Sequence, residues 1–571
     1  MVKEYAWQTV VKALQAEGVE RLYGLPGHPR QLYDALYDCP DIQPVLVRHE
    51  VAAVFMAMAE SRLTGKPAVC FAPPGPGLAN MFPGMLEAYS GCAPIILLGP
   101  GTATSKNGMG AFQEVDHMAT FREVTKWSVR VDRPERVAWA MRRAFSIAAG
   151  GKPGPVYVEL PLDLAVQEVE MPPYLPTKPA APPAPDPMAV KQVVDLLLAA
   201  QRPVLVAGGG AVLAGAGDGL RQIAEMLGMP VLTSLSGRGI IPETHPLALG
   251  MTGLYFNKLS KQAYRETDLM LSVGCRHEEF SSAAWKHLPA DARFVQIDID
   301  PFEFGRNFVP ELAVTADARL AASAIVQELR GRTIDEAAVR ARAEAIAAAR
   351  QGYEAEVAEE CSSANSVPIR TKRVVWEMSR VFGRDTVLVC ENGSQDLWAY
   401  YYPYYQVPEG GHCMVPAEQT CMGMGVMGAI GAKLARPDKK VVCTTGDGAF
   451  QMGMHELPTA VQYHAPVTWV ILNNNSLGWI KLHSRALNKR YIAVDFDVQP
   501  DFVQIAKANR CYGEKVQQPE EIRPALERAL GANSRGVPAV LEFVVEPWDF
   551  SWGFKEYHRD LNGFPPDLES L

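Results

Sequence analysis

Short apolar runs alternate along most of the chain with longer stretches in which apolar residues recur every three or four positions. The short runs are rich in Val, Ile and Leu, which favours buried strands, and the longer stretches predict amphipathic helices. The clearest strand candidates are residues 67–71, 93–98, 203–207, 269–273, 294–298, 440–444 and 467–472. This alternation is typical of parallel sheets with helices on both faces, so we predict an α/β fold of doubly wound parallel sheets.

Two stretches interrupt the pattern and predict domain boundaries. Residues 172–187 are dominated by proline, which sustains neither a helix nor a central strand. Residues 352–368 follow a segment rich in Ala, Arg and Glu and end at Pro368. The chain is too long for one hydrophobic core. We predict three doubly wound domains and an aromatic C-terminal tail or lid, with the bounds 1–172, 188–352, 368–550 and 551–571.

Composition narrows the class of protein. The chain has 571 residues, 48% of them hydrophobic and 21% charged, and a formal net charge of -9. An acidic balance argues against a nucleic-acid partner. No apolar run approaches the roughly 20 residues needed to cross a bilayer, and the first residues lack the apolar stretch of a signal peptide. None of the 10 cysteines forms a CxxC pair. These features predict a cytoplasmic enzyme with buried free thiols.

The most specific chemistry lies in the third domain. A predicted strand runs into Gly446, Asp447 and Gly448, and a second strand ends in Asn473-Asn474-Asn475-Ser476. Glycines after a strand let the backbone approach a phosphate, and the following helix N-terminus favours an anion. A carboxylate, an amide oxygen and a carbonyl form a ligand set suited to Mg²⁺. An ordinary turn beside an asparagine-rich loop is the alternative interpretation.

The GDG sequence followed by paired asparagines resembles the motif of thiamine-diphosphate enzymes. The resemblance implies that Mg²⁺ is bound by the side chains of Asp447 and Asn474 and by the carbonyl of Ser476. It also implies two groups of residues that contact the diphosphate: Gly446, Asp447, Gly448 and Ala449, and, in a second loop, Gly393, Ser394 and Gln395.

A second group of residues serves the other end of such a cofactor. The cofactor's 4′-amino group can remove the C2 proton if an acid holds N1′, and a glutamate whose pKa is raised in a dry pocket suits this task. The strand ending in Arg48-His49-Glu50 resembles the place of that acid, which assigns the catalytic role to Glu50. A helix-start glutamate is the alternative. Met422 resembles the apolar residue that wedges between the cofactor rings, although methionine also fills cores.

Nearly the whole chain resembles acetohydroxyacid synthases, also called acetolactate synthases, within the pyruvate oxidase and decarboxylase superfamily. The loops that carry the resemblance are residues 23–27, 74–80 and 111–116, together with Lys126. In that family the Phe and Gln of the third loop line the reaction site, which implies substrate contacts for Phe112, Gln113 and Lys126. Gln113 can donate a hydrogen bond to a substrate oxygen.

The middle domain resembles the flavin-binding domain of the same branch. The residues in question are Gly208, Gly209, Gly210, Gly253, Arg276 and Asp298. They imply FAD, which the family's carboligation does not consume, although tight strand–helix packing also selects glycine. Arg276 corresponds to an arginine that binds the carboxylate of a second 2-oxo acid, and a guanidinium suits that task.

Several pocket positions depart from the family. His483 replaces the tryptophan that recognises the acceptor, Trp479 replaces a methionine, and His28 replaces a small residue. Imidazoles titrate near neutrality, so His28 and His483 are candidate proton relays; pocket-wall or surface histidines are the alternative. We therefore expect intact cofactor machinery beside a rebuilt substrate pocket.

The resemblance implies a thiamine-diphosphate- and Mg²⁺-dependent transferase or carbon–carbon lyase that acts on 2-oxo acids, aldehydes or ketones. Alternatives are a non-ligating decarboxylase or C–C hydrolase, a flavin-dependent oxidase like pyruvate oxidase, and a non-catalytic cofactor-binding regulatory subunit. Family architecture implies a homodimer or homotetramer with active sites at subunit interfaces.

Overall fold

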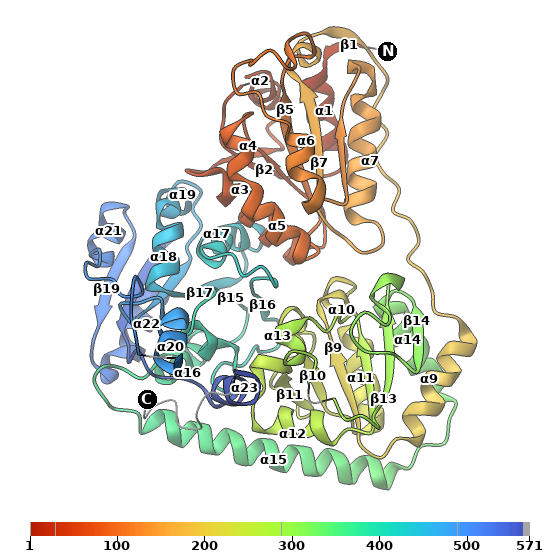
Figure 1. Ribbon diagram of the computed structural model, residues 1–571, viewed down its shortest axis with the longest axis vertical. Helices are drawn as coiled ribbons and strands as arrows, with labels where there is room; N and C mark the ends of the chain where they lie inside the picture. The colour runs from red at the N-terminus through yellow and green to blue at the C-terminus, as the bar shows by residue number, and fades with distance from the viewer. Residues whose placement is uncertain (1, 29, 287, 488, 563–571) are drawn as a thin grey trace. The chain divides into compact units, whose positions relative to one another are not determined.

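The computed structural model describes residues 2–28, 30–286, 288–487 and 489–562 (Figure 1). It has three six-stranded parallel sheets, one within each predicted domain. Strands β1 (Val2–Tyr5) and β8 (Glu168–Met171) form a separate antiparallel pair. The predicted α/β fold of doubly wound parallel sheets is confirmed. Among the described residues, no helix is both long and apolar enough to cross a membrane.

The first sheet has the strand order β3-β2-β4-β5-β7-β6. Its strands are β2 (Arg21–Gly24), β3 (Gln43–Leu46), β4 (Ala68–Phe71), β5 (Ile95–Gly101), β6 (Trp127–Arg130) and β7 (Val156–Pro161). The helices of this segment are α1 (Ala6–Ala16), α2 (Gln31–Tyr37), α3 (Glu50–Thr64), α4 (Pro76–Asn80), α5 (Phe82–Ser90), α6 (His117–Phe121), α7 (Val137–Ala149) and α8 (Leu162–Ala165). All strands are parallel, so the loops after β2, β3 and β4 meet at one edge.

The second sheet has the order β11-β10-β9-β12-β13-β14. Its strands are β9 (Pro203–Ala207), β10 (Val231–Thr233), β11 (Ala248–Met251), β12 (Leu269–Val273), β13 (Arg293–Asp298) and β14 (Leu312–Thr315). The helices are α9 (Pro187–Ala199), α10 (Gly209–Leu213), α11 (Gly217–Leu227), α12 (Lys258–Glu266), α13 (Glu279–Ser282), α14 (Ala318–Arg330) and α15 (Glu336–Ser362). Helix α15 runs through the boundary predicted at residue 352, because its Ala- and Glu-rich sequence continues to favour helix.

The third sheet has the order β16-β15-β17-β18-β20-β19. Its strands are β15 (Thr386–Cys390), β16 (His412–Met414), β17 (Lys440–Gly446), β18 (Thr468–Asn473), β19 (Tyr512–Val516) and β20 (Ala539–Val544). The helices are α16 (Thr371–Phe382), α17 (Met424–Ala435), α18 (Asp447–Gly453), α19 (Leu457–Gln462), α20 (Gly478–Leu487), α21 (Phe502–Ala508), α22 (Ile522–Asn533) and α23 (Trp552–Asn562). Short 3-10 turns η5 (Gly253–Tyr255), η7 (Asp396–Tyr400) and η8 (Met454–Glu456) lie in loops.

Backbone contacts divide the chain into two compact units. Unit 1 consists of residues 1–181, 416–437 and 452–465, and unit 2 of the remaining residues. Helix α17 therefore belongs with the first sheet, where it packs along α3. A Cβ atom on Gly431 would lie 2.4 Å from the carbonyl oxygen of Met56, so glycine permits this close helix contact.

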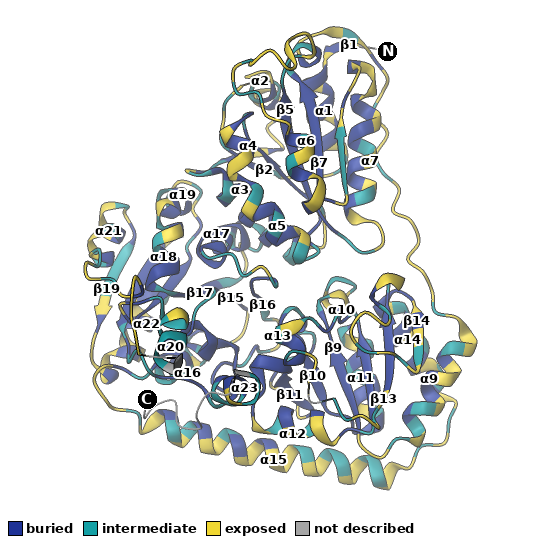
Figure 2. Ribbon diagram, in the orientation of Figure 1, coloured by how far each residue is buried: buried dark blue, intermediate teal, exposed yellow. Residues whose placement is uncertain are grey.

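Burial follows the predicted pattern (Figure 2). Strands β5, β7 and β18 are buried at every position, as expected for central strands covered on both faces. Helix α3 is buried along most of its length, from Ala52 to Ala59. All ten cysteines are free thiols and seven of them are buried, which confirms that expectation.

Candidate active site

Glu50 is the first residue of α3, directly beyond the carboxyl end of β3, and its side chain is buried. Asn80 donates a hydrogen bond from Nδ2 to Oε2 of Glu50 at 2.9 Å. Gly77 lies against the other carboxylate oxygen, since a Cβ atom there would be 3.4 Å from Oε1. Glu50, the predicted acid, therefore contacts the loop of residues 74–80, and its Oε2 accepts a hydrogen bond from the neutral amide of Asn80.

A residue that the sequence did not single out fixes the backbone before Glu50. Glu456 is fully buried, and its Oε1 accepts hydrogen bonds from the backbone N–H groups of Arg48 at 2.7 Å and His49 at 2.9 Å. Its Oε2 accepts from Thr459 Oγ1 at 2.5 Å. Burial raises the pKa of Glu456, and these donors oppose that rise. Nothing in its local sequence indicates this role, because the contacts join residues 408 and 407 positions apart.

The Pro74–Asn80 loop is held by a second unpredicted residue. His117, which is fully buried, accepts a hydrogen bond at Nε2 from the backbone N–H of Gly75 at 3.0 Å. Its Nδ1 faces Glu159 Oε2 at 3.5 Å, which favours the tautomer with the proton on Nδ1. Gln113 has a φ of 59°. It packs closely on Gly75, since a Cβ atom added to Gly75 would lie 2.8 Å from the Cβ atom of Gln113. Gln113 thus lies beside the loop that carries Asn80.

The other predicted residues of unit 1 divide into two groups. His28 is exposed in the loop after β2, and Phe112 is 81% exposed beside Gln113. Both follow strands at the edge where Glu50 lies. Lys126 precedes β6 and donates from Nζ to the carbonyl of Gly150 at 2.7 Å. It therefore lies at the opposite, amino-terminal edge of the parallel sheet and caps the end of α7, so the structure does not bring it to Gln113.

Met422 lies in a loop fixed by a buried carboxylate. The side chain of Met422 is half-buried just before α17. Glu87 on α5 accepts hydrogen bonds from the backbone N–H groups of Ala417 and Cys421, the latter at 3.0 Å. Gly423 is the N-cap residue before α17 and has a φ of 88°, a conformation that favours glycine. The backbone around Met422, the predicted wedge residue, is therefore fixed on one side by Glu87 and on the other by the start of α17.

The predicted metal ligands come together in unit 2. Asp447 and Asn474 follow the neighbouring parallel strands β17 and β18, and both are buried. Burial raises the pKa of Asp447 to about 6, although the side chain of Gln499 and the backbone N–H groups of Asp447, Gly448 and Asn474 oppose the rise. Asn474 Oδ1 accepts from the backbone N–H of Ser476 at 3.2 Å, which closes the asparagine turn. Asp447 and Asn474 thus stand at the ends of neighbouring strands, and carboxylate, amide and carbonyl oxygens are the ligand types that suit Mg²⁺.

The loop after β15 supplies polar atoms beside these ligands. A Cβ atom on Gly478 would lie 2.2 Å from Ser394 Oγ and 2.7 Å from Asn474 Nδ2, so Ser394 adjoins the asparagine loop. Gln395 points elsewhere: it accepts from Thr371 Oγ1 at 2.6 Å and donates to the carbonyl of Pro547 at 3.1 Å. Gly393 packs against Asp396, whose Oδ2 accepts from the backbone N–H of Gly446 at 3.1 Å.

Two polar atoms of this loop are buried without a hydrogen-bond partner among the described residues, Ser394 Oγ and Asp396 Oδ1. Buried polar atoms are nearly always paired, so these two indicate a missing polar group. Burial raises the pKa of Asp396 to about 7, and the charge of Asp447 adds to the rise. A diphosphate oxygen can accept a hydrogen bond from the Ser394 hydroxyl, and its cation can offset the charge of Asp396, so the residues present fit such a group.

Comparison with known proteins agrees with this geometry. Family models match over three ranges: the N-terminal binding domain of thiamine pyrophosphate enzymes at residues 6–120, the central domain at 190–325 and the C-terminal binding domain at 391–543. A probable acetolactate synthase large subunit from Methanococcus aeolicus is 32% identical over 95% of this chain and 92% of its own. The Escherichia coli (strain K12) acetolactate synthase isozyme 3 large subunit is 33% identical over 92% of each chain. The chain belongs to the thiamine-diphosphate-dependent acetolactate synthase family.

The position at which this chain departs from the family's tryptophan lies in an aromatic cluster. Trp479 and His483 on α20 pack against α23, with the Trp479 ring centroid 5.1 Å from Phe554 and 5.6 Å from His558. The His483 and His558 rings lie 5.2 Å apart. Phe280, close in sequence to Arg276, also contacts Trp479 at 6.3 Å. The sequence indicated an aromatic C-terminal tail, but it did not indicate that Phe554 and His558 contact Trp479 and His483.

The described part of the predicted tail or lid is a packed helix. Lys261 holds α23 through Glu556 at 2.9 Å and Asp560 at 2.8 Å. A Cβ atom on Gly553 would lie 2.0 Å from the carbonyl oxygen of Phe256. The helix is therefore docked on η5 and α12 as far as Asn562, and residues 563–571 lie outside the described residues.

The glycines predicted to bind the family's flavin have packing roles in unit 2. The N–H of Gly208 donates to the carbonyl of Val273 at 2.9 Å, and that of Gly210 to the carbonyl of Gly274 at 3.0 Å. A Cβ atom on Gly253 would lie 1.8 Å from the carbonyl oxygen of Phe280. Gly209 similarly faces Ser236.

The two polar residues of the flavin prediction have protein partners. Arg276 forms an ion pair with Glu278 at 2.8 Å. Asp298 accepts at Oδ1 from the backbone N–H of Asp300 at 2.9 Å. Together with the packed glycines, these contacts account for the pattern without a cofactor, so it is not specific evidence for FAD.

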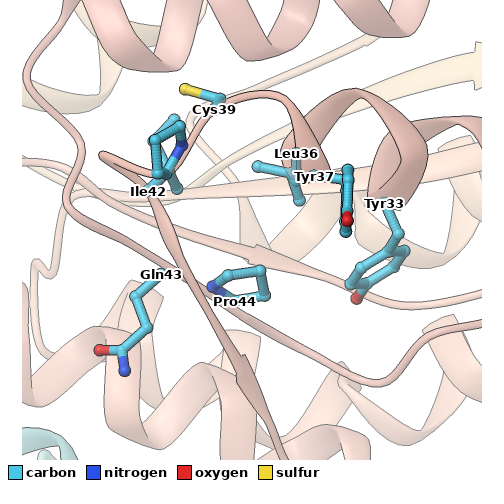
Figure 3. Close-up of a pocket in the computed structure, with 8 residues that line it drawn as sticks. Tyr33, Leu36, Tyr37, Cys39, Ile42, Gln43 and Pro44 are labelled. Atoms are coloured by element: carbon cyan, nitrogen blue, oxygen red, sulfur yellow. The ribbon is translucent and has the colours of Figure 1, made fainter.

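Two cavities accompany these features. One of 780 Å³ in unit 2 adjoins the asparagine loop and is lined in part by Asn473, Asn475 and Gln499. Another of 570 Å³ opens beside α2 and the edge strand β3, where Tyr33, Leu36 and Ile42 form its apolar wall (Figure 3). The second cavity contains none of the predicted site residues.

Proposed function

We propose that this protein is a carboligase that uses thiamine diphosphate and Mg²⁺ to join small 2-oxo acids or to transfer their carbon units to a carbonyl acceptor. The observation that carries the proposal is the presence of both halves of the cofactor chemistry. Unit 1 has a buried acid, Glu50, and unit 2 has Asp447 and Asn474 together with the unpaired hydroxyl of Ser394. A regulatory or scaffold protein needs neither an acid nor a metal site.

Bound thiamine diphosphate would supply the carbon nucleophile and electron sink. Glu50 would hold a proton between Oε1 and the cofactor's pyrimidine nitrogen, because Oε2 is already occupied by Asn80. Asp447, Asn474 and the carbonyl of Ser476 would hold Mg²⁺, and Ser394 would donate to the diphosphate. Gln113 would donate a hydrogen bond to the substrate oxygen that gains negative charge.

The acceptor side of the pocket distinguishes this chain from its relatives. We assign Trp479 and His483 to the wall of the acceptor side, and Arg276 to the carboxylate of an acceptor 2-oxo acid. His28 and Phe112 are further candidate substrate residues. Arg276 would exchange its Glu278 contact for the substrate carboxylate. A packed wall of Trp479 and His483 supports an acceptor range different from that of biosynthetic relatives.

FAD belongs to the proposal as a cofactor of the middle domain, implied by the resemblance of Gly208–Gly210 and Asp298. Its test is the visible spectrum of the purified protein after incubation with FAD and desalting. Retained flavin absorbance near one equivalent supports it. Because the glycines have packing roles, a colourless protein that is fully active would remove FAD from the proposal.

We also propose a homodimer or homotetramer in which Glu50 of one subunit serves the Asp447 site of another. The support is family architecture. Analytical ultracentrifugation of active protein tests it, and an active monomer would contradict it.

The deciding experiment is NMR analysis of products from pyruvate, with thiamine diphosphate and Mg²⁺, with and without benzaldehyde. Acetolactate or a mixed hydroxyketone is the expected result. Acetaldehyde as the sole product would favour the non-ligating decarboxylase. With bound cofactor and no pyruvate turnover, larger 2-oxo acids and diketones become the donors to test.

A further inference from the structure

The loop that begins η7 places a second carboxylate beside the predicted metal ligand Asp447. Strands β15 and β17 are parallel neighbours, with Cys390 paired to Thr444, so the loops that follow them meet at one edge. Asp396 reaches across this edge and accepts from the backbone N–H of Gly446, the residue before Asp447. Both carboxylates belong to unit 2 and are 0% and 1% exposed, respectively.

Asp396 has fewer hydrogen-bond partners than the buried acids Glu456 and Glu159. Glu456 accepts three hydrogen bonds, and Glu159 accepts from Arg130 and Tyr157. Asp396 has the single N–H of Gly446, and its Oδ1 has no hydrogen-bond partner among the described residues. Two buried acids side by side, one with an unpaired oxygen, form an arrangement that a cation stabilises.

We propose that Asp396 is a second carboxylate of the Mg²⁺ site, in addition to the ligands that the family motif implies. This inference rests on the cofactor site of the proposed function and adds a residue to it. Asp396 would hold the cation either directly or through one of its bound water molecules, since carboxylates serve Mg²⁺ in both ways. The site would consequently bind a divalent cation even before the diphosphate arrives.

Mn²⁺ binding to the full-length protein, freed of metal with EDTA, tests the proposal without any turnover. Free Mn²⁺ is measured by its EPR signal as protein is titrated, with and without thiamine diphosphate. Asp396→Asn, which retains the shape of the side chain and removes its charge, should weaken Mn²⁺ binding about tenfold or more. Asp447→Asn should weaken it further.

A matched control separates this effect from a general loss of charge or stability. Asp317 is also buried and caps α14 by accepting from the backbone N–H of Leu320, a role that asparagine performs equally well. Asp317→Asn should bind Mn²⁺ like the unmodified protein. Thermal melting checks that each variant is folded. If Asp396→Asn does not fold, Asp396→Ser, which keeps an acceptor for Gly446, takes its place.

Mn²⁺ affinity of a folded Asp396 variant within twofold of the unmodified protein would overturn the proposal. A variant that loses affinity for thiamine diphosphate but keeps its affinity for Mn²⁺ would also overturn the proposal, because Asp396 would then contact the diphosphate only. The outcome is independent of the reaction. Mn²⁺ binding that depends on Asp396, in a protein that forms no carboligation product from pyruvate, larger 2-oxo acids or diketones, would reject the proposed function and leave this inference standing.

Discussion

Asn80 and Glu50 are joined by a hydrogen bond of 2.9 Å from Nδ2 to Oε2, between the end of α4 and the start of α3. The bond leaves Oε1 of Glu50 facing Gly77, where no side chain covers it. The neutral amide orients the carboxyl group without supplying a positive charge that would favour its ionised form. Asn80 therefore positions the acid that the proposed mechanism requires.

Glu50→Gln should retain cofactor binding and lose at least about 100-fold in turnover, the range of acid–base catalysis. The reason is that glutamine keeps the hydrogen-bonding shape but cannot hold the exchangeable proton. The measurement is the rate of hydrogen–deuterium exchange at the cofactor C2 position, together with product formation. Turnover close to that of the unmodified protein would remove Glu50 from the catalytic role.

Glu456→Gln should lower both stability and turnover, because glutamine offers one acceptor oxygen where the carboxylate offers two. Either Thr459 Oγ1 or the two backbone N–H groups of Arg48 and His49 then face an amide donor. We expect a loss of about 1–3 kcal/mol in unfolding free energy from urea denaturation. Glu521→Gln on the exposed surface is the control. An unchanged urea midpoint in Glu456→Gln would show that the loop before Glu50 holds its position without this acceptor.

The docking of α23 should weaken at acid pH. Burial, together with the neighbouring His483, lowers the pKa of His558 to about 3. An unfolded histidine has a pKa near 6.5, so between pH 6.5 and 3 the released helix binds a proton that the docked helix excludes. The stability contributed by neutral His558 is thus complete above about pH 6.5 and falls as the pH falls.

Hydrogen–deuterium exchange of residues 552–562 at pH 7 and pH 5 measures this effect. Lys261, Glu556 and Asp560 also face this interface and form ion pairs there. His558→Phe should remove most of the pH dependence. Equal exchange at the two pH values in the unmodified protein would exclude a titrating role for His558.

Two glycines with the same backbone conformation provide a matched test of packing. Gly253 and Gly305 both have a φ of 72°, but a Cβ atom on Gly253 would lie 1.8 Å from the carbonyl of Phe280, whereas Gly305 has open space. Gly305→Ala should cost about 1–2 kcal/mol from strain alone. Gly253→Ala should cost more than about 4 kcal/mol. Comparable melting temperatures for the two variants would contradict the close contact.

Local sequence patterns predicted several parts of this molecule correctly. The apolar runs that became β4, β9, β12 and β18 were visible because central strands are buried on both faces. The boundary at residue 352 stays a prediction, and α15 continues past it to Ser362, since helical composition marks a helix and not the end of a domain. The diphosphate contact of Gln395 stays a prediction; its side chain bonds to Thr371 and Pro547, partners that are distant in sequence and that local patterns did not indicate.

The sequence by itself determined the fold class, the glycine and asparagine turns at Asp447 and Asn474, and the acid Glu50, because these depend on strand ends and on residues close together in the chain. Only the tertiary structure decided which long-range partners hold them. Asn80, Glu456 and His117 act through contacts between separate elements, and Asp396 meets Gly446 because β15 and β17 are neighbours in the sheet. The burial that leaves Ser394 and Asp396 with unpaired atoms likewise exists only once the loops pack together.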